Sequence, residues 1–201
     1  MLTQSHIAIG LLIAAKSGRR AAITGAILGG IAPDISMLPM MLVSSLMLGQ
    51  SMEQIWSVTY YSAPWWTIDQ ISNSAPLYAV FAAVSALMVR RSDHWAPRFM
   101  LAFSLTALLH VGFDLLTHAS DGHIHFWPLT DFVFASPVSY WESEHHGRLF
   151  GFVEAFAGLI AVVVLWRMYR GWVVRTFCGI LALMSGLGLV LSVFLSLSFG
   201  R

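Results

Sequence analysis

One apolar run, residues 99–116, constrains this chain most, because it contains both a histidine and an aspartate. About 18 apolar residues are enough for a helix to cross the hydrocarbon core of a membrane. His110 and Asp114 are four residues apart, so they project from one helix face, and His118 continues that face. Such groups are costly in a membrane unless they are partnered. The pattern indicates either part of a metal or proton site or a hydrogen-bonded pair that joins two helices.

The composition is typical of an integral membrane protein. Hydrophobic residues make up 57% of the 201 residues and charged residues only 10%, whereas soluble domains carry about 25% charged residues. We therefore expect one all-α, polytopic membrane domain over residues 1–201. No basic arm is interleaved with aromatic residues, so nucleic acid is not an expected partner. The single cysteine, Cys178, provides neither a disulfide nor a thiolate metal cluster.

The hydropathy pattern predicts about five spanning helices plus a short N-terminal helix, judged against the length that a crossing needs. The apolar segments are residues 2–15, 21–49, 75–89, 99–118, 149–166 and 173–198. Pro33-Asp34 interrupts the second segment, because proline removes a backbone donor and clashes with the preceding turn. Residues 50–74 are predicted to lie on the surface at the membrane interface. Residues 119–148 are predicted to form a polar segment that caps one end of the bundle.

The positive charges predict the orientation of the chain. Five crossings after a short first helix place three basic clusters on one side of the membrane, and these clusters hold nine of the eleven basic residues. They are Lys16, Arg19 and Arg20; Arg90, Arg91 and Arg98; and Arg167, Arg170 and Arg175. By the positive-inside rule this side is cytoplasmic. The polar cap at 119–148 and the C-terminus are then expected on the outer side.

The same topology predicts that polar residues from separate segments meet at one depth. With a rise of about 1.5 Å per residue, His110 and Asp114 lie roughly 17 and 23 Å above the cytoplasmic start of their helix. Asp34 and Glu154 fall at a similar height. If the first helix runs inward, His6 lies near the outer end, at the rim of any cavity that these residues share, and Asn73 stands where the third segment begins. A shared cavity is the economical explanation, because separate burial of so many polar groups is expensive.

The donor types at this depth favour particular ions. Carboxylates with imidazoles and without thiolates suit zinc, manganese or iron, and a more oxygen-rich shell favours magnesium or calcium. A metal ion there would activate water and polarise a phosphoryl or carbonyl group. Structural roles remain as alternatives: Asp34 as the N-cap of the helix after the break, and Glu154 as a partner of Arg148 or of a neighbouring helix.

Three elements of the sequence resemble a known family. They are His6, the run Gly-Ala-Ile-Leu-Gly-Gly-Ile-Ala-Pro-Asp at 25–34, and His110-x-x-x-Asp114. In this order they resemble the YdjM-like inner-membrane proteins, which are described as LexA-regulated, membrane-bound metal-dependent hydrolases. Residues 125–141 resemble the long form of that family's Trp-Pro-Phe-Ser element, and the resemblance covers roughly residues 3–155. It implies a location in the bacterial inner membrane, where the orientation predicted from the positive charges puts the cap on the periplasmic side.

The resemblance also implies a ligand set, and the chain departs from it at two positions. The implied metal ligands are His6, Asp34, His110 and Asp114, with Asp69 and Asn73 as possible substitutes. Ser36 stands where the family commonly has a second acid, and Asn73 where a ligand histidine would stand. These losses would shift the metal preference, weaken binding or leave a scaffold without chemistry.

Together these observations predict a metal-dependent hydrolase that acts on a lipid-linked or amphipathic substrate at the periplasmic side of the inner membrane. The expected ion is zinc or manganese. The expected metal ligands are His6, Asp34, His110, Asp114, Asn73 and His118. The expected general base is Glu154 or Asp69. Expected partners are membrane lipids, and other membrane proteins or a second copy of the chain. The alternatives are an accessory or scaffold subunit with a degraded metal site, which the two departures favour, and a small transporter.

Overall fold

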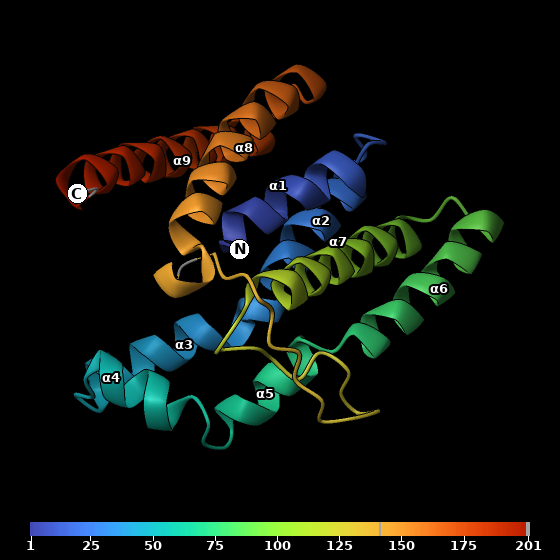
Figure 1. The fold of residues 1–201 in the computed structure, drawn as a ribbon. Coiled ribbons are helices and arrows are strands. Elements are labelled where there is room, and N and C mark those ends of the chain that lie inside the picture. Colours follow the sequence, from blue (N-terminus) through green and yellow to red (C-terminus); the bar gives the residue numbers. More distant parts are fainter. Residues whose placement is uncertain (141, 200–201) are drawn as a thin grey trace.

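Helix α7, Trp95–Thr117, is the central element of the fold (Figure 1). In the computed structural model it packs against α1 (Thr3–Ile13), α2 (Arg20–Ile31) and α6 (Ala75–Arg91). His94 is the N-cap of this helix, and its Nδ1 atom accepts a hydrogen bond from the backbone N–H of Ala96 in the first turn. The structure describes residues 1–140 and 142–199, and side chains as far as residue 190; the predicted outer location of the C-terminus falls on residues outside this part.

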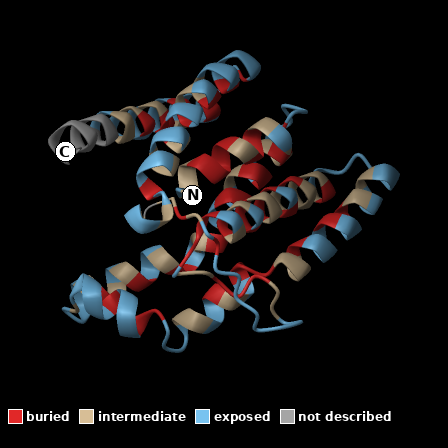
Figure 2. Cartoon of the chain, viewed as in Figure 1, coloured by how far each residue is buried: buried red, intermediate tan, exposed pale blue. Residues whose placement is uncertain are grey.

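Helices α8 (Gly147–Met168) and α9 (Trp172–Phe199) form an antiparallel hairpin beside this core (Figure 1). The hairpin reaches the rest of the bundle mainly through α1, which therefore lies between α2, α7 and α8. The hydroxyl of Tyr169, at the end of α8, donates to the carbonyl oxygens of Leu11 and Ala15 at 2.7 and 2.8 Å. These bonds satisfy carbonyl groups that the end of a helix leaves free. The short helix α1 is thus enclosed by longer ones, and most of its residues are buried (Figure 2).

The predicted break at Pro33-Asp34 is confirmed. Helix α2 ends at Ile31, and the chain continues as the 3-10 turn η1 (Pro33–Ser36), α3 (Met37–Leu42) and the π-helical turn η2 (Val43–Met47). The two parts of this segment are bent by 58°. The bend turns Asp34 back toward the bundle, where it reaches the site described in the next subsection.

The prediction that residues 50–74 lie on the surface is wrong for their second half. The chain passes through α4 (Met52–Gln54) and η3 (Ile55–Thr59) and then enters α5 (Trp65–Ser72), which buries Asp69 and Ser72. The side chains of Ser72 and Asn73 donate to the carbonyl oxygen of Pro33 at 3.0 and 3.3 Å. These bonds hold α5 against the broken turn and satisfy the carbonyl oxygen of Pro33 at the point where the regular helix is interrupted.

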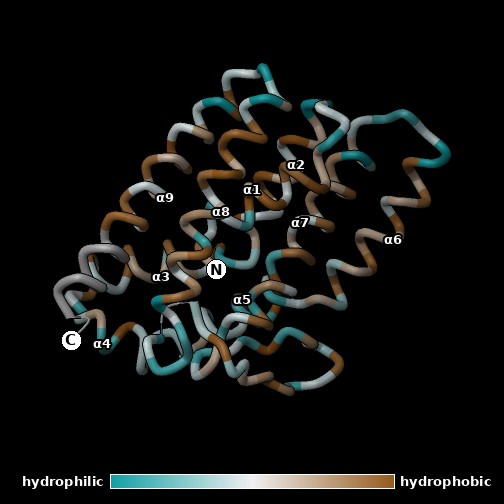
Figure 3. The backbone as a smooth tube through the Cα atoms, turned by 45° about the horizontal axis from the view of Figure 1, so that its top comes forward, coloured by the Kyte–Doolittle hydropathy of each residue, from teal (hydrophilic) through white to brown (hydrophobic). Residues whose placement is uncertain are grey.

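The helices support the predicted polytopic membrane fold. Three of them, α7, α8 and α9, are long and apolar enough to cross a membrane, and the count rises to five if each bent pair is one span. The second bent pair is α5 with α6, which meet at 43°. Among the described residues, α1 is an apolar helix that is too short to cross. Figure 3 shows the hydrophobic stretches of the helices lying between hydrophilic loops at the two ends of the bundle.

Glycines let α2 approach α7 closely enough for their backbones to touch. A Cβ atom on Gly25 would lie 2.3 Å from the carbonyl oxygen of Phe99, and one on Gly29 would lie 2.2 Å from that of Phe103. Both distances are far below van der Waals contact, so no larger side chain fits without moving a helix. The close approach places the carbonyl group of Gly30 beside α7, where its oxygen lies 2.9 Å from Nδ1 of His110.

Candidate metal centre

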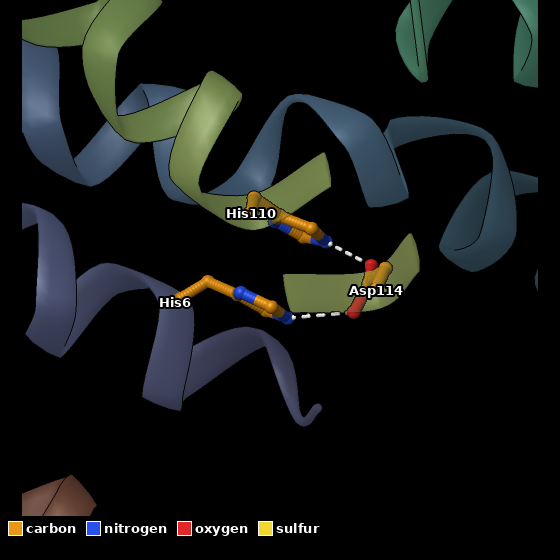
Figure 4. A group of neighbouring side chains, drawn as sticks. All are labelled: His6, His110 and Asp114. Atoms are coloured by element: carbon orange, nitrogen blue, oxygen red, sulfur yellow. Dashed lines mark ion pairs between the residues drawn. The ribbon is translucent and has the colours of Figure 1, made fainter. Parts of the chain in front are cut away.

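Two helices bring two histidines onto the carboxylate of Asp114 (Figure 4). His6 on α1 places its Nε2 atom 3.1 Å from Oδ1 of Asp114, and His110 on α7 places its Nε2 atom 2.9 Å from Oδ2. The two rings are stacked with their centroids 3.6 Å apart, so both Nε2 atoms point toward the same carboxylate. One ligand atom from each residue lies within 4.8 Å of the others, and all three residues are buried.

The orientation of the His110 ring is set by the backbone. Its Nδ1 atom lies 2.9 Å from the carbonyl oxygen of Gly30. A carbonyl oxygen only accepts, so Nδ1 carries the hydrogen and donates it. In the neutral ring Nε2 then holds a lone pair, and this lone pair faces the carboxylate oxygens of Asp114 and Asp34 at 2.9 and 3.5 Å. Two acceptors face each other there, so the arrangement requires a positive charge between them, either a proton or a metal ion.

Asp34 and His118 extend this cluster, as the sequence predicted. Asp34 reaches it from the broken turn and accepts a hydrogen bond from the hydroxyl of Thr3. His118 places Nε2 3.6 Å from Oδ1 of Asp114, while its Nδ1 lies 2.9 Å from Oδ2 of Asp121. The amino group of Met1 also lies 2.9 Å from Oδ1 of Asp114. The predicted proximity of Asp34 to His110 and Asp114 is therefore confirmed.

The charge on His118 is strongly favoured by its two acidic neighbours. Burial disfavours the protonated ring, but the hydrogen bonds with Asp114 and Asp121 outweigh it and raise the pKa of His118 to about 9. Burial also disfavours the charged form of Asp121 and by itself would raise its pKa. The hydrogen bond with His118 outweighs this effect, so the pKa of Asp121 is lowered. Asp121 accepts the hydrogen of Nδ1 and so orients the ring. Without a metal ion the ring is protonated, and His118 would bind an ion through Nε2 only after that nitrogen has lost its hydrogen.

Three of the predicted site residues do not contact this cluster in the part of the chain that the structure describes. Glu154 accepts the backbone N–H of Leu2 at 2.7 Å and lines a separate cavity of about 240 Å³. Asn73 donates to Oδ1 of Asp69 at 3.2 Å and to the carbonyl of Pro33, so it holds α5 in place. Asp69 is fully buried beneath the cap.

One predicted position within the site is also wrong. His6 was expected at the rim, near the outer end of a short helix, but it lies at the centre of the cluster and is buried. The reason is that α1 begins inside the bundle. A Cβ atom on Gly10 of α1 would meet the side chain of Thr106 on α7 at 2.2 Å, and one on Gly30 would meet Ile7 at 2.7 Å. These close contacts draw α1, and His6 with it, between α2 and α7.

Two cavities lead from the cluster toward the polar end of the bundle. A small cavity of about 90 Å³ is lined by Asp34 and Asp114 together with residues 1–3. A larger one of about 470 Å³ lies next to it, and the two share Met37, His118, His123 and Tyr140. His123 and Tyr140 come from the polar segment 119–148, so this segment forms a wall of both cavities.

Backbone hydrogen bonds hold the polar segment in this position. The N–H groups of Ser136 and Tyr140 donate to the carbonyl oxygens of His118 and Thr117 at 2.9 and 3.2 Å. Farther along, the N–H of Ala75 at the start of α6 donates to the carbonyl of His125 at 2.9 Å. The segment therefore covers the end of α7 that carries the cluster.

His123, one of several histidines in the cap, and Asp121 were not assigned to the site from the sequence. Nδ1 of His123 lies 3.0 Å from Oδ2 of Asp69 and 3.0 Å from the hydroxyl of Tyr60. This pair joins residues 54 positions apart, and one of them lies in an irregular segment, so no periodic pattern reveals it. Asp121 was detectable in principle, because it follows His118 by three residues.

Comparisons of the chain with protein-family models, with curated proteins and with solved structures find no match.

Proposed function

We propose that this chain is a membrane-embedded, metal-dependent hydrolase that acts on a lipid-linked or amphipathic substrate. One observation supports the proposal above the others. Gly30 accepts the hydrogen of Nδ1 on His110, so the other nitrogen directs its lone pair at the carboxylates of Asp114 and Asp34, and these acceptors call for a cation as their common partner. The cavities beside the cluster provide access for a substrate.

His6, His110 and Asp114 are the proposed ligands, with Asp34 and His118 available to complete the coordination. Nitrogen and oxygen donors without a thiolate suit zinc or manganese. When bound, such an ion supplies Lewis acidity that polarises a phosphoryl or carbonyl group. Hydrogen bonds at the far ring nitrogens orient two of these ligands: the carbonyl of Gly30 contacts Nδ1 of His110, and the carboxylate of Asp121 contacts Nδ1 of His118.

His123 and Asp69 are proposed to act as a pair beside these ligands. Asp69 is fully buried, so it is not itself exposed to a substrate. Its carboxylate accepts the hydrogen of Nδ1 on His123, which leaves Nε2 as the basic nitrogen of a ring that lines both cavities. Asp69, which the sequence suggested as a general base, is therefore a positioning residue for His123 in this proposal.

The proposed location is the bacterial inner membrane with the metal centre on the periplasmic side. Two of the basic clusters lie at one end of the bundle, because Asp93 forms ion pairs with both Arg19 and Arg98. These clusters mark the cytoplasmic side under the positive-inside rule. His110 and Asp114 lie toward the opposite end of α7.

This orientation predicts the signals of reporter fusions. A reporter fused after Arg201 is expected to be active in the periplasm, whereas one inserted within residues 167–175 is expected to be active in the cytoplasm. Paired alkaline phosphatase and fluorescent-protein fusions measure both positions. The opposite pair of signals would place the metal centre on the cytoplasmic side.

A non-catalytic accessory subunit is the second candidate function. It is favoured by Ser36 and Asn73, which stand where the resembling family commonly has an acid and a histidine. The structure uses Asn73 to hold α5 and not to contact the cluster. An accessory subunit is expected to co-purify with other membrane proteins and to hold no stoichiometric metal.

Metal removal and restoration separate the two candidates. The purified chain in lipid nanodiscs, supplied with zinc or manganese, is expected to hydrolyse chromogenic esters or phosphodiesters that carry an alkyl chain. Treatment with a chelator is expected to lower the rate by more than about 100-fold, because the Lewis acid is lost, and one equivalent of metal should restore it. Release of the chromophore at the same rate with and without metal would contradict the proposal.

A further inference from the structure

The larger cavity lies beside a segment that is suited to the membrane interface. Residues 37–61 contain a single charged residue, Glu53. They expose large apolar side chains, among them Leu38, Leu46, Met47 and Val58. A segment of this kind is stable where its apolar side chains enter the lipid. Met37, Trp56, Tyr60 and Tyr61 of this segment line the cavity, so the cavity is positioned to receive the polar part of a lipid.

One wall of this cavity is aromatic. Trp56, Tyr60 and Tyr61 all line it. Trp66 packs behind Tyr60 and Tyr61, with ring centroids 5.6 and 5.2 Å away, and fixes their orientation. Trp56 and Tyr61 remain 40% and 54% exposed, so both rings are accessible to a ligand. Rigid aromatic rings with accessible surface favour ligands that present a flat apolar face.

The polar part of the described lining, called the polar wall below, has no lysine or arginine side chain. It consists of His118, Ser120, Asp121, His123 and Tyr140, as far as the structure describes the lining. The recognition of phosphate or carboxylate groups usually relies on arginine or lysine. Both ring nitrogens of His118 already face the carboxylates of Asp114 and Asp121, so a strongly anionic headgroup has no free cationic partner among these residues.

Asp121 provides a free acceptor on the polar wall. Its Oδ2 atom is paired with Nδ1 of His118 at 2.9 Å, whereas its Oδ1 atom is buried and has no hydrogen-bond partner among the described residues. A buried carboxylate oxygen without a partner is unfavourable, and a ligand hydroxyl would satisfy it. Since Oδ2 is already engaged by His118, Asp121 offers one acceptor oxygen, which suits a hydroxyl group better than an ammonium group with its three donors.

We infer that the larger cavity binds the uncharged sugar headgroup of a glycolipid, an inference that rests on the proposed function and names its substrate class. The C–H face of the sugar stacks on Trp56 and Tyr61, and its hydroxyl groups donate to Asp121. The cavity volume of about 470 Å³ is suitable for a sugar headgroup. Since this cavity shares lining residues with the smaller one at Asp34 and Asp114, an ester group that joins the acyl chain to such a headgroup would lie next to the metal ligands, where its carbonyl could be polarised.

Three amphiphiles that share an octyl chain test the headgroup directly: octyl thioglucoside, octyl phosphate and octylammonium. Binding to the full chain in phosphatidylcholine nanodiscs, without added metal, is measured by titration calorimetry, and empty nanodiscs provide the background. Octyl thioglucoside is expected to bind saturably with one site per chain, and the other two are expected not to displace it. Trp56→Ala removes one of the two stacking rings and should weaken this binding by at least about tenfold. A tenfold change in affinity corresponds to roughly 1.4 kcal/mol of binding free energy.

Trp95→Ala is the matched control, because Trp95 is also exposed, at 63%, but begins α7 at the other end of the bundle. It should leave binding unchanged. Tyr61→Ala removes the second exposed ring and should weaken binding as Trp56→Ala does. Agreement between the two variants makes misfolding of one of them an unnecessary explanation. Stronger binding of octyl phosphate or octylammonium, or equal binding by the Trp56 and Trp95 variants, would overturn the inference.

The outcome also separates this inference from the hydrolase proposal. Sugar binding by a chain that takes up no ion when zinc or manganese is supplied would support the assignment of the cavity and contradict the hydrolase. A metal-loaded, active chain that prefers octyl phosphate would support the hydrolase and contradict the assignment of the cavity to a sugar.

Discussion

Replacement of Asp114 by alanine is expected to lower the metal affinity of this protein by more than about 100-fold, since the loss of supporting contacts alone typically costs 10- to 100-fold. The carboxylate contacts His6 and His110 and lies 3.6 Å from His118. Without the carboxylate of Asp114, the two stacked imidazoles share no anionic ligand, and two neutral nitrogen donors hold a divalent ion poorly. Competition with a chromogenic chelator in nanodiscs measures the change.

The control for this variant is Asp93→Ala. Asp93 is exposed and pairs with Arg19 and Arg98 at the end of the bundle away from the cluster. Its pKa is lowered by the two arginines, so it is charged at neutral pH as Asp114 would be in a metal centre. Its loss should leave metal affinity unchanged. Equal affinities of the wild-type chain and the Asp114 variant would remove Asp114 from the ligand set.

Replacement of Gly29 by alanine is expected to destabilise the bundle by about 1–3 kcal/mol, the usual cost of an atom forced into a closely packed contact. The added Cβ would lie 2.2 Å from the carbonyl oxygen of Phe103, and this oxygen belongs to the backbone of α7, so the two helices must move apart. That movement also displaces the neighbouring carbonyl of Gly30 from His110. Metal affinity should therefore fall together with stability.

Gly112→Ala provides the matched comparison. Gly112 also lies in a helix, but a Cβ atom there meets nothing within 4 Å. This change should be neutral, or stabilising by up to about 1 kcal/mol, because alanine is the better helix former. Unfolding followed by circular dichroism, with metal affinity measured in parallel, compares the two variants. If both variants were equally stable, close contact between α2 and α7 would not be what orients His110.

The central part of the site was predictable because it depends on local periodicity. The spacing of His110, Asp114 and His118 places all three on one helix face, and the structure confirms their mutual approach. Proline at position 33 predicted the break that turns Asp34 inward. Both predictions needed only the geometry of a helix and the cost of burying polar groups in a membrane.

The remaining parts depend on contacts that no local pattern encodes. Asn73 was expected to replace a ligand, but its amide instead bonds to Asp69 and to the carbonyl of Pro33. Glu154 was expected at the depth of the cluster, but its carboxylate accepts from the backbone of Leu2 at the start of α1, which agrees with the alternative role of bonding to a neighbouring helix. Height along a helix axis says nothing about rotation around it, so matching depths did not bring Glu154 to the cluster.

X-ray absorption at the metal edge, on the purified chain loaded with zinc or manganese in nanodiscs, tests most directly whether His6, His110 and Asp114 hold an ion. Our account predicts one ion per chain by elemental analysis, with at least two imidazole nitrogens and a carboxylate oxygen at about 2.0–2.2 Å, as for zinc sites of this donor type. The imidazole signal should weaken in a His6→Ala variant. A chain that retains no ion after removal of unbound metal, or a spectrum without imidazole scattering, would contradict the account.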